Sequence, residues 1–197
     1  KNYEKYSDNL TSIMFSQDFY AVKYLQTNQI IPQNSVIVNG QSGDFISGNH
    51  LPNLNYNSKK ILLNLLEYYI YKHYNLWNKY FNKKKNILLQ LIISSIRDNL
   101  DFNKKNMFKL YELLEFENRQ CKYVINGQRL YEFFNYEWRL PLWDSLYLDF
   151  WAKVPLQEKK NQILYKKTIH NTNWCDVWRD IPINPKNSFQ YHIRALR

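Results

Sequence analysis

Cysteine is scarce in this chain of 197 residues, which contains only two. Cys121 and Cys175 lie far apart and neither belongs to a CxxC pair, so their spacing argues against a structural zinc site. Such low cysteine usage is typical of a reducing compartment, and we expect a cytoplasmic protein, although these two residues could also form a single disulfide.

Long apolar runs and several familiar catalytic motifs are also missing. The longest apolar stretches, near residues 61–66 and 87–93, are interrupted by Asn or Gln and are too short to span a membrane. No signal peptide is visible. The four histidines form no HxxxH or HExxH pair, and the chain contains no GxxxxGK[ST] loop, GxGxxG loop or nucleophile elbow.

Apolar residues and positive charge are plentiful. Hydrophobic residues make up 45% of the chain and aromatic residues 17%, enough for a single folded domain with a sizeable core. The net charge of +10 favours anionic partners such as nucleic acid, phosphorylated ligands or an anionic membrane surface. Richness in Asn, Lys, Ile and Tyr is also typical of an AT-rich genome, and no nucleic-acid-binding motif accompanies the charge.

Glycine is rare and concentrated in one stretch. The chain has four glycines, and Gly40, Gly43 and Gly48 fall within nine residues that directly follow the apolar triplet Val36–Val38. In one interpretation, Gly40, Gln41, Ser42 and Gly43 present backbone N–H groups and side chains to phosphate oxygens. In the other, the glycines only satisfy the dihedral angles of a strand-to-helix turn.

One acid and one histidine accompany this glycine loop. Asp44 is the only acid between Asp18 and Glu67, and in the functional interpretation its carboxylate holds Mg²⁺. His50 is the only histidine beside the loop, and we expect it to form hydrogen bonds there rather than to act as a catalyst.

Residues 35–39 form the only convincing strand, and the rest of the chain is mostly helical in pattern. The strand is continuously apolar, as expected for a strand buried on both faces in a parallel sheet. We find no second comparable strand, so this strand pairs either with segments that show no strand pattern or with strands outside these residues. We prefer the second alternative and interpret the chain as the later part of an α/β domain. A long helix or a pair of helices is expected over residues 58–80, and single helices over 86–100, 106–117, 120–134, 145–154 and 157–170. A connection is expected at 83–85 and an irregular tail at 171–197.

Two further groups of charged residues stand out. Arg139 and Asp144 bracket Pro141, and we expect an ion pair that fixes this corner, with Asp144 also able to cap the following helix. Lys159, Lys160, Lys166 and Lys167 populate one predicted basic helix. A solvated face is the default interpretation, and a phosphate contact at Lys166 is the alternative.

The glycine loop and the proline corner together resemble the asparagine-synthetase-like family of ATP pyrophosphatases. That family carries a loop G-E-G-[AS]-D-E-x-x-G-G-Y after a buried strand, which Gly40-Gln-Ser-Gly-Asp44 and Gly48 match in part. It also carries a corner E-x-R-x-P-[FL]-x-D, which residues 137–144 fit closely. The particular residues of both motifs are most similar to those of a branch found in surface-polysaccharide gene sets. The resemblance spans about residues 20–170.

The resemblance implies a parallel-sheet nucleotide-binding domain of the PP-loop type that activates a carboxylate with ATP and Mg²⁺. Ammonia then displaces AMP, so the resemblance also implies a carboxylate-bearing substrate and a glutaminase that supplies ammonia. The branch resemblance points to a sugar as that substrate. Asp44 would lie near the Mg²⁺–pyrophosphate, Lys166 would contact pyrophosphate, and Arg139 would belong to the same site. Nucleic acid is not an expected partner.

Two departures from the family pattern matter. Gln41 stands where the synthetases have a catalytic glutamate, and an amide cannot accept a proton. The S-G-G-x-D-S pyrophosphate loop is absent, and we expect it upstream of these residues, in a preceding part of the domain. We therefore predict no adenylation by this chain alone. The alternative is a non-catalytic, basic helical binding or scaffolding relative that has lost the chemistry.

Overall fold

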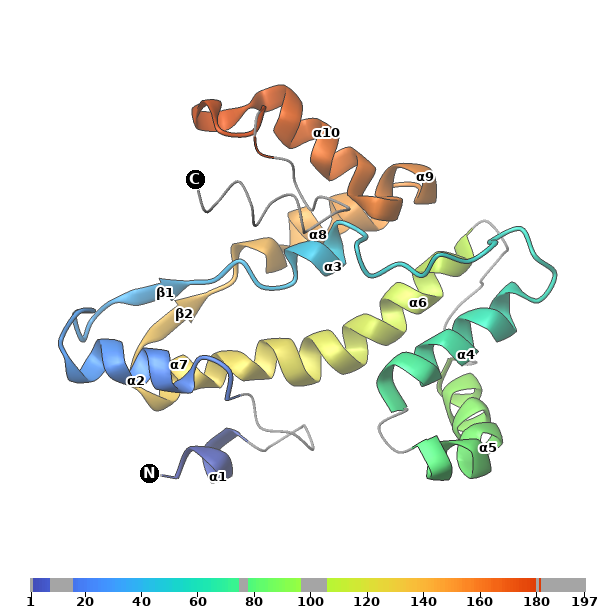
Figure 1. Cartoon of the computed structure of the whole chain (residues 1–197), viewed down its shortest axis with the longest axis horizontal. Helices are drawn as coiled ribbons and strands as arrows, with labels where there is room; N and C mark the ends of the chain where they lie inside the picture. Colours follow the sequence, from blue (N-terminus) through green and yellow to red (C-terminus); the bar gives the residue numbers. More distant parts are fainter. Residues whose placement is uncertain (1, 8–15, 75–77, 97–105, 180, 182–197) are drawn as a thin grey trace, which may run out of the picture.

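The computed structural model describes residues 2–7, 16–74, 78–96, 106–179 and 181, which form helices around one small sheet (Figure 1). The α-helices are α1 Tyr3–Ser7, α2 Phe19–Thr27, α3 Gly43–Ile46, α4 Ile61–Tyr74, α5 Asn78–Ile96, α6 Met107–Glu115, α7 Arg129–Phe133, α8 Ser145–Lys153, α9 Leu156–Lys159 and α10 Ile163–Thr172. The other helical segments are the π-helix η3 Phe116–Ile125 and the 3₁₀ turns η4 Asn126–Gln128, η5 Pro141–Trp143, η6 Lys160–Gln162 and η7 Trp174–Asp176. This mostly helical chain with a parallel sheet agrees with the expected α/β class.

The sheet pairs two segments that are far apart in the sequence. Strand β1 (Val36–Val38) lies parallel to β2 (Glu137–Arg139), so that Val36 is opposite Glu137, Ile37 opposite Trp138 and Val38 opposite Arg139. The backbone N–H of Asn39 continues the ladder by donating to the carbonyl of Arg139 at 3.0 Å. The expectation that β1 has no partner within these residues is therefore wrong. β2 escaped notice because a Glu-Trp-Arg triplet has neither an apolar run nor a clear alternation.

The expectation that β1 is buried on both faces is also wrong. Val36 and Val38 are 46% and 67% exposed, whereas Ile37 packs against a buried cluster. One face of β1 therefore contacts the protein and the other is open. Parallel sheets are normally covered on both faces, so two exposed β-branched residues on such a strand are unusual.

Three hydrophobic clusters hold the helices together. The first joins α4, α5 and α6, the second joins α1, α2 and α7, and the third joins α3 and α8. The continuous helical stretch from α6 through η3 and η4 to α7 runs from the first cluster to the second (Figure 1). This stretch replaces the two separate helices expected at 106–117 and 120–134, and it supplies the surface against which the glycine loop packs.

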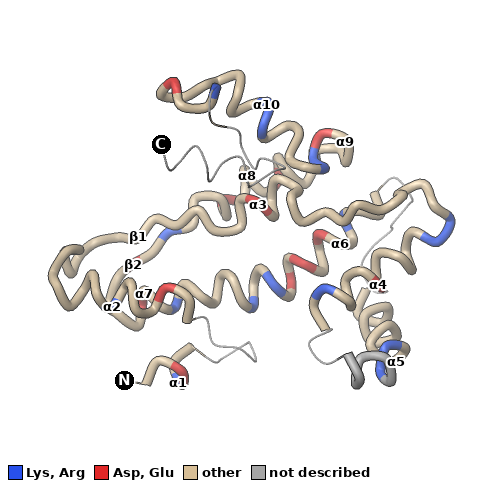
Figure 2. The backbone as a smooth tube through the Cα atoms, viewed as in Figure 1, with Lys and Arg blue, Asp and Glu red and all other residues tan. Residues whose placement is uncertain are grey.

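The distribution of positive charge differs from the expectation in two places. Residues 83–85 lie within α5 rather than in a connection, and the Nζ of Lys85 is 2.6 Å from Glu67. The basic helix expected at 157–170 is divided, because Asn161 and Gln162 have φ angles of 57° and 61° between α9 and α10. Figure 2 shows Lys and Arg on α4, α5, α6, α9 and α10, so the net charge is not concentrated on one element.

The described segments contain no helix that combines the length and apolar character needed to cross a membrane.

Cys121 and Cys175 are both free thiols, so the possible single disulfide between them is not formed. Of the expected tail at 171–197, α10 and η7 take up the beginning, whereas residues 180 and 182–197 lie outside the described residues.

Candidate functional site

The glycine loop and the proline corner leave the sheet at the same edge. Because β1 and β2 are parallel, their carboxyl ends lie side by side. The glycine loop leaves the end of β1, and residues 140–144 of the proline corner leave the end of β2. The motifs also touch, since a Cβ placed on Gly43 would lie 2.8 Å from the Cδ1 of Leu142. The carboxyl edge of parallel strands is where open α/β sheets bind their ligands.

Hydrogen bonds hold the loop in a left-handed turn. Ser42 has a φ of 70°, a region that side chains rarely occupy, and its hydroxyl donates to the Oε1 of Gln120 at 2.7 Å. The N–H of Gln41 donates to the Oδ1 of Asn39 at 3.2 Å. Ser42 and Gln120 are both buried, so the π-helix η3 fixes the turn that precedes Asp44.

Glycine is required at position 48 of the loop but not, on steric grounds, at position 40. Gly48 has a φ of +95°, and a Cβ there would lie 2.3 Å from the carbonyl oxygen of Lys159, so both the dihedral angle and the space require glycine. Gly40 has no positive φ, and nothing lies within 4 Å of the position a Cβ would take. The turn-geometry interpretation therefore explains Gly48, whereas Gly40 leaves an open approach to the backbone.

Asp44 presents a half-exposed carboxylate at the start of α3. Its side chain is 55% exposed, Oδ1 accepts from the N–H of Phe45 at 2.8 Å, and Oδ2 lies 2.9 Å from the Nε2 of His50. The hydrogen bond from His50 is the largest influence and, with the charge of that ring, lowers the pKa of Asp44 although partial burial opposes it.

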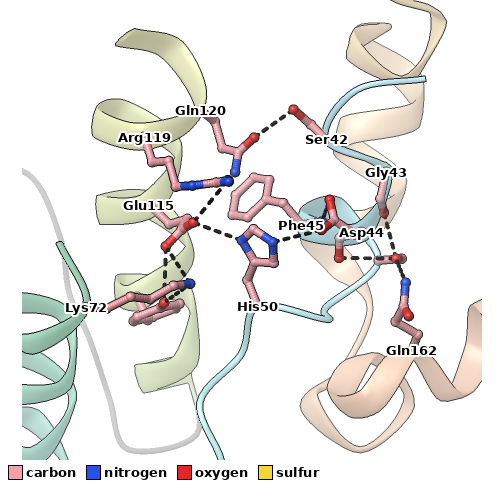
Figure 3. Close-up of polar contacts among 12 residues, drawn as sticks. Ser42, Gly43, Asp44, Phe45, His50, Lys72, Glu115, Arg119, Gln120 and Gln162 are labelled. Carbon is pink, nitrogen blue, oxygen red and sulfur yellow. Dashed lines mark hydrogen bonds and ion pairs between the residues drawn. The ribbon is translucent and has the colours of Figure 1, made fainter. Parts of the chain in front are cut away.

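His50 links Asp44 to a buried carboxylate. Its Nδ1 lies 2.8 Å from the Oε1 of Glu115, so the ring bridges two acids, as Figure 3 shows. Burial by itself lowers the pKa of His50, but the hydrogen bonds to Asp44 and Glu115 outweigh it, and the net pKa is raised. His50 is therefore the loop hydrogen bonder that was expected.

Glu115 collects donors from several elements although its side chain is fully buried. Besides His50, its donors are His73 Nε2 at 2.8 Å, Tyr111 OH at 3.1 Å, Lys72 Nζ at 3.3 Å and, more distantly, Arg119 Nη1 at 3.8 Å. Burial opposes ionisation, but the bonds from the two histidines and the charge of Lys72 prevail, so the pKa of Glu115 is lowered. We call Asp44, His50, Glu115 and these donors the Glu115 network.

The side chains of the two other predicted site residues do not join the Glu115 network. Arg139 is the last residue of β2, and its side chain pairs with Glu137, Nη2 to Oε2 at 2.8 Å, so the expected Arg139–Asp144 ion pair is wrong. Asp144 instead caps α8 by accepting from the N–H groups of Leu146 and Tyr147. Lys166 lies on α10, where it lines a basic hollow with Lys167, His170 and Arg179.

Lys159 does not share the solvated basic face expected of the four lysines. Its side chain is 4% exposed, and its Nζ lies 2.7 Å from the Oε1 of Glu112 and donates to the carbonyl of Trp151 at 2.9 Å. Through the pair with Glu112, this buried ammonium joins α9 to α6. It is therefore not available to a phosphate at the glycine loop.

Glu115 was missed in the sequence although a signal was present. It falls one helical turn after Tyr111 on the apolar face of α6, next to Leu114, where an acid is out of place unless it is paired. Among the described residues, no group of three or more His, Cys, Asp or Glu side chains could hold a metal ion. Comparison of the chain with protein-family models, curated proteins and solved structures finds no significant match.

Proposed function

We propose that this chain is the later part of a PP-loop-type α/β domain in an ATP-dependent amidotransferase of the asparagine-synthetase kind. The observation that carries the proposal is the parallel pairing of β1 with β2. This pairing brings two motifs about 100 residues apart, the glycine loop and the proline corner, to one sheet edge and into contact. A shared edge is the arrangement that a nucleotide site of this kind requires.

In the proposed reaction a substrate carboxylate attacks ATP, pyrophosphate leaves, and ammonia then displaces AMP to form an amide. The open backbone at Gly40 would let phosphate oxygens approach, and the half-exposed Asp44 would face the metal–pyrophosphate group. The turn between Gly40 and Asp44 is formed by Gln41, Ser42 and Gly43. Arg139 ends β2 at the same edge of the sheet, and Lys166 reaches this site only if α10 or the ligand extends toward it.

The residues present fit a magnesium ion that is held mainly by phosphates. Mg²⁺ commonly uses one or two carboxylates together with water and substrate phosphates rather than an all-protein cage. Asp44 supplies one carboxylate whose two oxygens each accept one hydrogen bond, which leaves lone pairs free for a cation. Bound Mg²⁺ would neutralise charge on the leaving pyrophosphate.

We propose that further strands complete the sheet and bring the missing pyrophosphate loop. In the described part of the chain the sheet has only two strands, so each strand has one edge without a partner strand. The exposed Val36 and Val38 also leave one face of this parallel sheet uncovered, which supports further protein over it. The substrate would bear a carboxylate, and a sugar of surface polysaccharides is the candidate that the residues of the two motifs favour. Ammonia would come from a separate glutaminase.

A non-catalytic binding or scaffolding role is the second candidate, and one observation favours it. The polar groups of the loop are largely engaged by the protein itself, since Ser42 bonds to Gln120 and Asp44 bonds to His50. With Gln41 in place of a proton-accepting glutamate, a loop of this kind could keep its shape without the chemistry.

Calorimetric titration with magnesium pyrophosphate separates the two candidates. In the catalytic proposal the chain binds pyrophosphate at millimolar concentrations, and Asp44→Asn weakens binding about tenfold, the loss of one charged contact. The matched control is Asp149→Asn, which removes an exposed aspartate on α8. Absent binding, or binding that both variants retain equally, favours the scaffolding role. Pyrophosphate release from ATP by the chain alone, lost in Asp44→Ala, would show that no further strands are needed.

A further inference from the structure

The proposed pyrophosphate site has no cation of its own in the glycine loop. Residues 24–58, which contain the whole loop, include no Lys or Arg. Lys159 is buried and paired with Glu112, and Lys166 lines a hollow that includes no residue of the loop. Asp44 adds a negative charge, and a bound Mg²⁺ neutralises only part of the charge of pyrophosphate. The proposed chemistry therefore requires a further cation that reaches the loop from another element.

Arg119 of the π-helix η3 is close to the loop. The residue that follows it accepts the hydrogen bond that fixes the left-handed turn. The Nη1 of Arg119 is 3.8 Å from the Oε1 of Glu115, the same oxygen that lies 2.8 Å from the Nδ1 of His50. One carboxylate and one imidazole ring therefore separate the guanidinium from Asp44, and Figure 3 shows Arg119 extending from η3 toward them. The hydrogen bond from His50 lowers the pKa of Asp44 most, and the charge of Arg119 adds to this effect.

The guanidinium of Arg119 has hydrogen-bond donors that the protein does not use. A carboxylate has about four acceptor sites, and Glu115 has four donors closer than Arg119. These come from His50, His73, Tyr111 and Lys72. The 3.8 Å contact to Arg119 is an ion pair that is too long for a hydrogen bond. Within the described residues Arg119 makes no hydrogen bond, and its side chain is 39% exposed, so a ligand can reach its N–H groups.

We propose that Arg119 is a phosphate-binding residue of the candidate site and contacts the pyrophosphate group beside Asp44. A guanidinium offers two parallel N–H groups that match two oxygens of a phosphate. Its charge offsets charge that Mg²⁺ at Asp44 leaves on the phosphates. The ion pair with Glu115 keeps the guanidinium near the loop, and its exposure lets it turn toward a ligand. The identity of the anion rests on the proposed function.

Calorimetric titration with pyrophosphate in the presence of Mg²⁺ tests this contact. Arg119→Gln should weaken binding about tenfold or more, the value of one charged hydrogen bond. Arg119→Lys should recover part of the affinity, because it keeps the charge but not the planar fork. The matched control is Lys122→Gln, which removes the same charge from an exposed position on η3, where Lys122 donates to Asn118. It should change the affinity less than about twofold. Equal affinities of Arg119→Gln and Lys122→Gln would overturn the role of Arg119.

A second titration without Mg²⁺ separates this role from the proposed function. Without the ion, Asp44 only repels pyrophosphate, so Asp44→Asn should not weaken binding, whereas Arg119→Gln still should. If only Asp44→Asn weakens binding in the presence of Mg²⁺, the role of Arg119 is wrong and the proposed function stands. If only Arg119→Gln weakens it, Arg119 binds the anion and the metal-binding role of Asp44 is wrong. Absent binding by the wild type would overturn both.

Urea unfolding distinguishes a ligand contact from a purely structural role. Because the ion pair of Arg119 with Glu115 is long and partly exposed, Arg119→Gln should leave the urea midpoint close to the wild-type value. Weaker pyrophosphate binding with an unchanged midpoint supports the contact. Weaker binding that is accompanied by a clear fall in the midpoint would mean that Arg119 only supports the Glu115 network, and would overturn the proposal.

Discussion

The Nδ1 of His50 lies 2.8 Å from the Oε1 of Glu115, a carboxylate with no solvent exposure on a helix 65 residues further along the chain. The other nitrogen of the same ring holds Asp44. A single imidazole thus connects the half-exposed acid of the glycine loop to the buried acid of α6. The position of Asp44 is fixed by α6 and α4 as much as by its own loop.

Replacing Glu115 with glutamine should destabilise the protein strongly. The change leaves Lys72, His50 and His73 around a neutral group, and removing one partner of a buried charge cluster costs about 3–5 kcal/mol. The measurement is the free energy of unfolding in urea. Glu67→Gln is the matched control, because that carboxylate is 41% exposed and pairs with Lys85, so it should cost less than about 1 kcal/mol. Equal losses in both variants would contradict the central place of Glu115.

The Glu115 network should make stability depend on pH in both directions. The pKa of Glu115 is lowered in the folded state, so its contribution is present above the ordinary value of 4.5 and is lost as pH falls. The pKa of His50 is raised, so its contribution is complete below the ordinary value of 6.5 and is lost as pH rises through the folded value. Urea midpoints measured from pH 4 to 9 should therefore peak between about 4.5 and 6.5, and the peak should flatten in Glu115→Gln. A wild-type profile that rises steadily to pH 9 would disprove this.

The glycines at positions 48 and 40 should respond differently to alanine. Gly48→Ala forces a side chain into a positive φ and against the backbone of Lys159, so we expect a loss of about 1–3 kcal/mol in thermal or urea unfolding. Gly40→Ala meets open space and should leave stability within about 0.5 kcal/mol of the wild type. If phosphate approaches the backbone there, Gly40→Ala should still weaken pyrophosphate binding. Comparable destabilisation by both changes would mean that the loop is held differently.

At the proline corner, stability should follow the helix cap and not an ion pair. Asp144→Ala removes the acceptor for two N–H groups at the start of α8 and should cost about 1 kcal/mol. Asp144→Asn keeps a capping oxygen and should cost much less. Arg139→Ala breaks only an exposed pair with Glu137 and should change stability by less than about 0.5 kcal/mol. A larger effect of Arg139→Ala than of Asp144→Ala would restore the ion-pair interpretation.

The features that local chemistry determines could be predicted from the sequence. The apolar triplet at β1, the helix after Asp144 and the hydrogen-bonding role of His50 each follow from neighbouring residues. Pairing between segments far apart in the sequence could not be predicted in this way. β2 is three residues long, and its strand character comes from lying beside β1, which no local pattern of Glu137–Arg139 reveals.

The buried charges were predicted least well, for a related reason. An acid on an apolar helix face shows that a partner exists but does not say which one, and the partners of Glu115 come from α4 and the glycine loop. Lys159 was placed in a solvated row because its helix was expected to continue. The left-handed residues Asn161 and Gln162 interrupt that helix and leave Lys159 buried.

The π-helix η3 sets the rotational phase between the Glu115 network and the sheet. An α-helix turns by about 100° per residue, and a π-helical stretch shifts that phase by spreading the same path over more residues. Deleting one residue from Phe116–Ile125 would let the segment return to α-helical form, and Gln120 would rotate away from Ser42. The glycine loop would then lose its hydrogen bond to Gln120 although every site residue is still present. The number of residues in η3 therefore matters to the site as much as their identity.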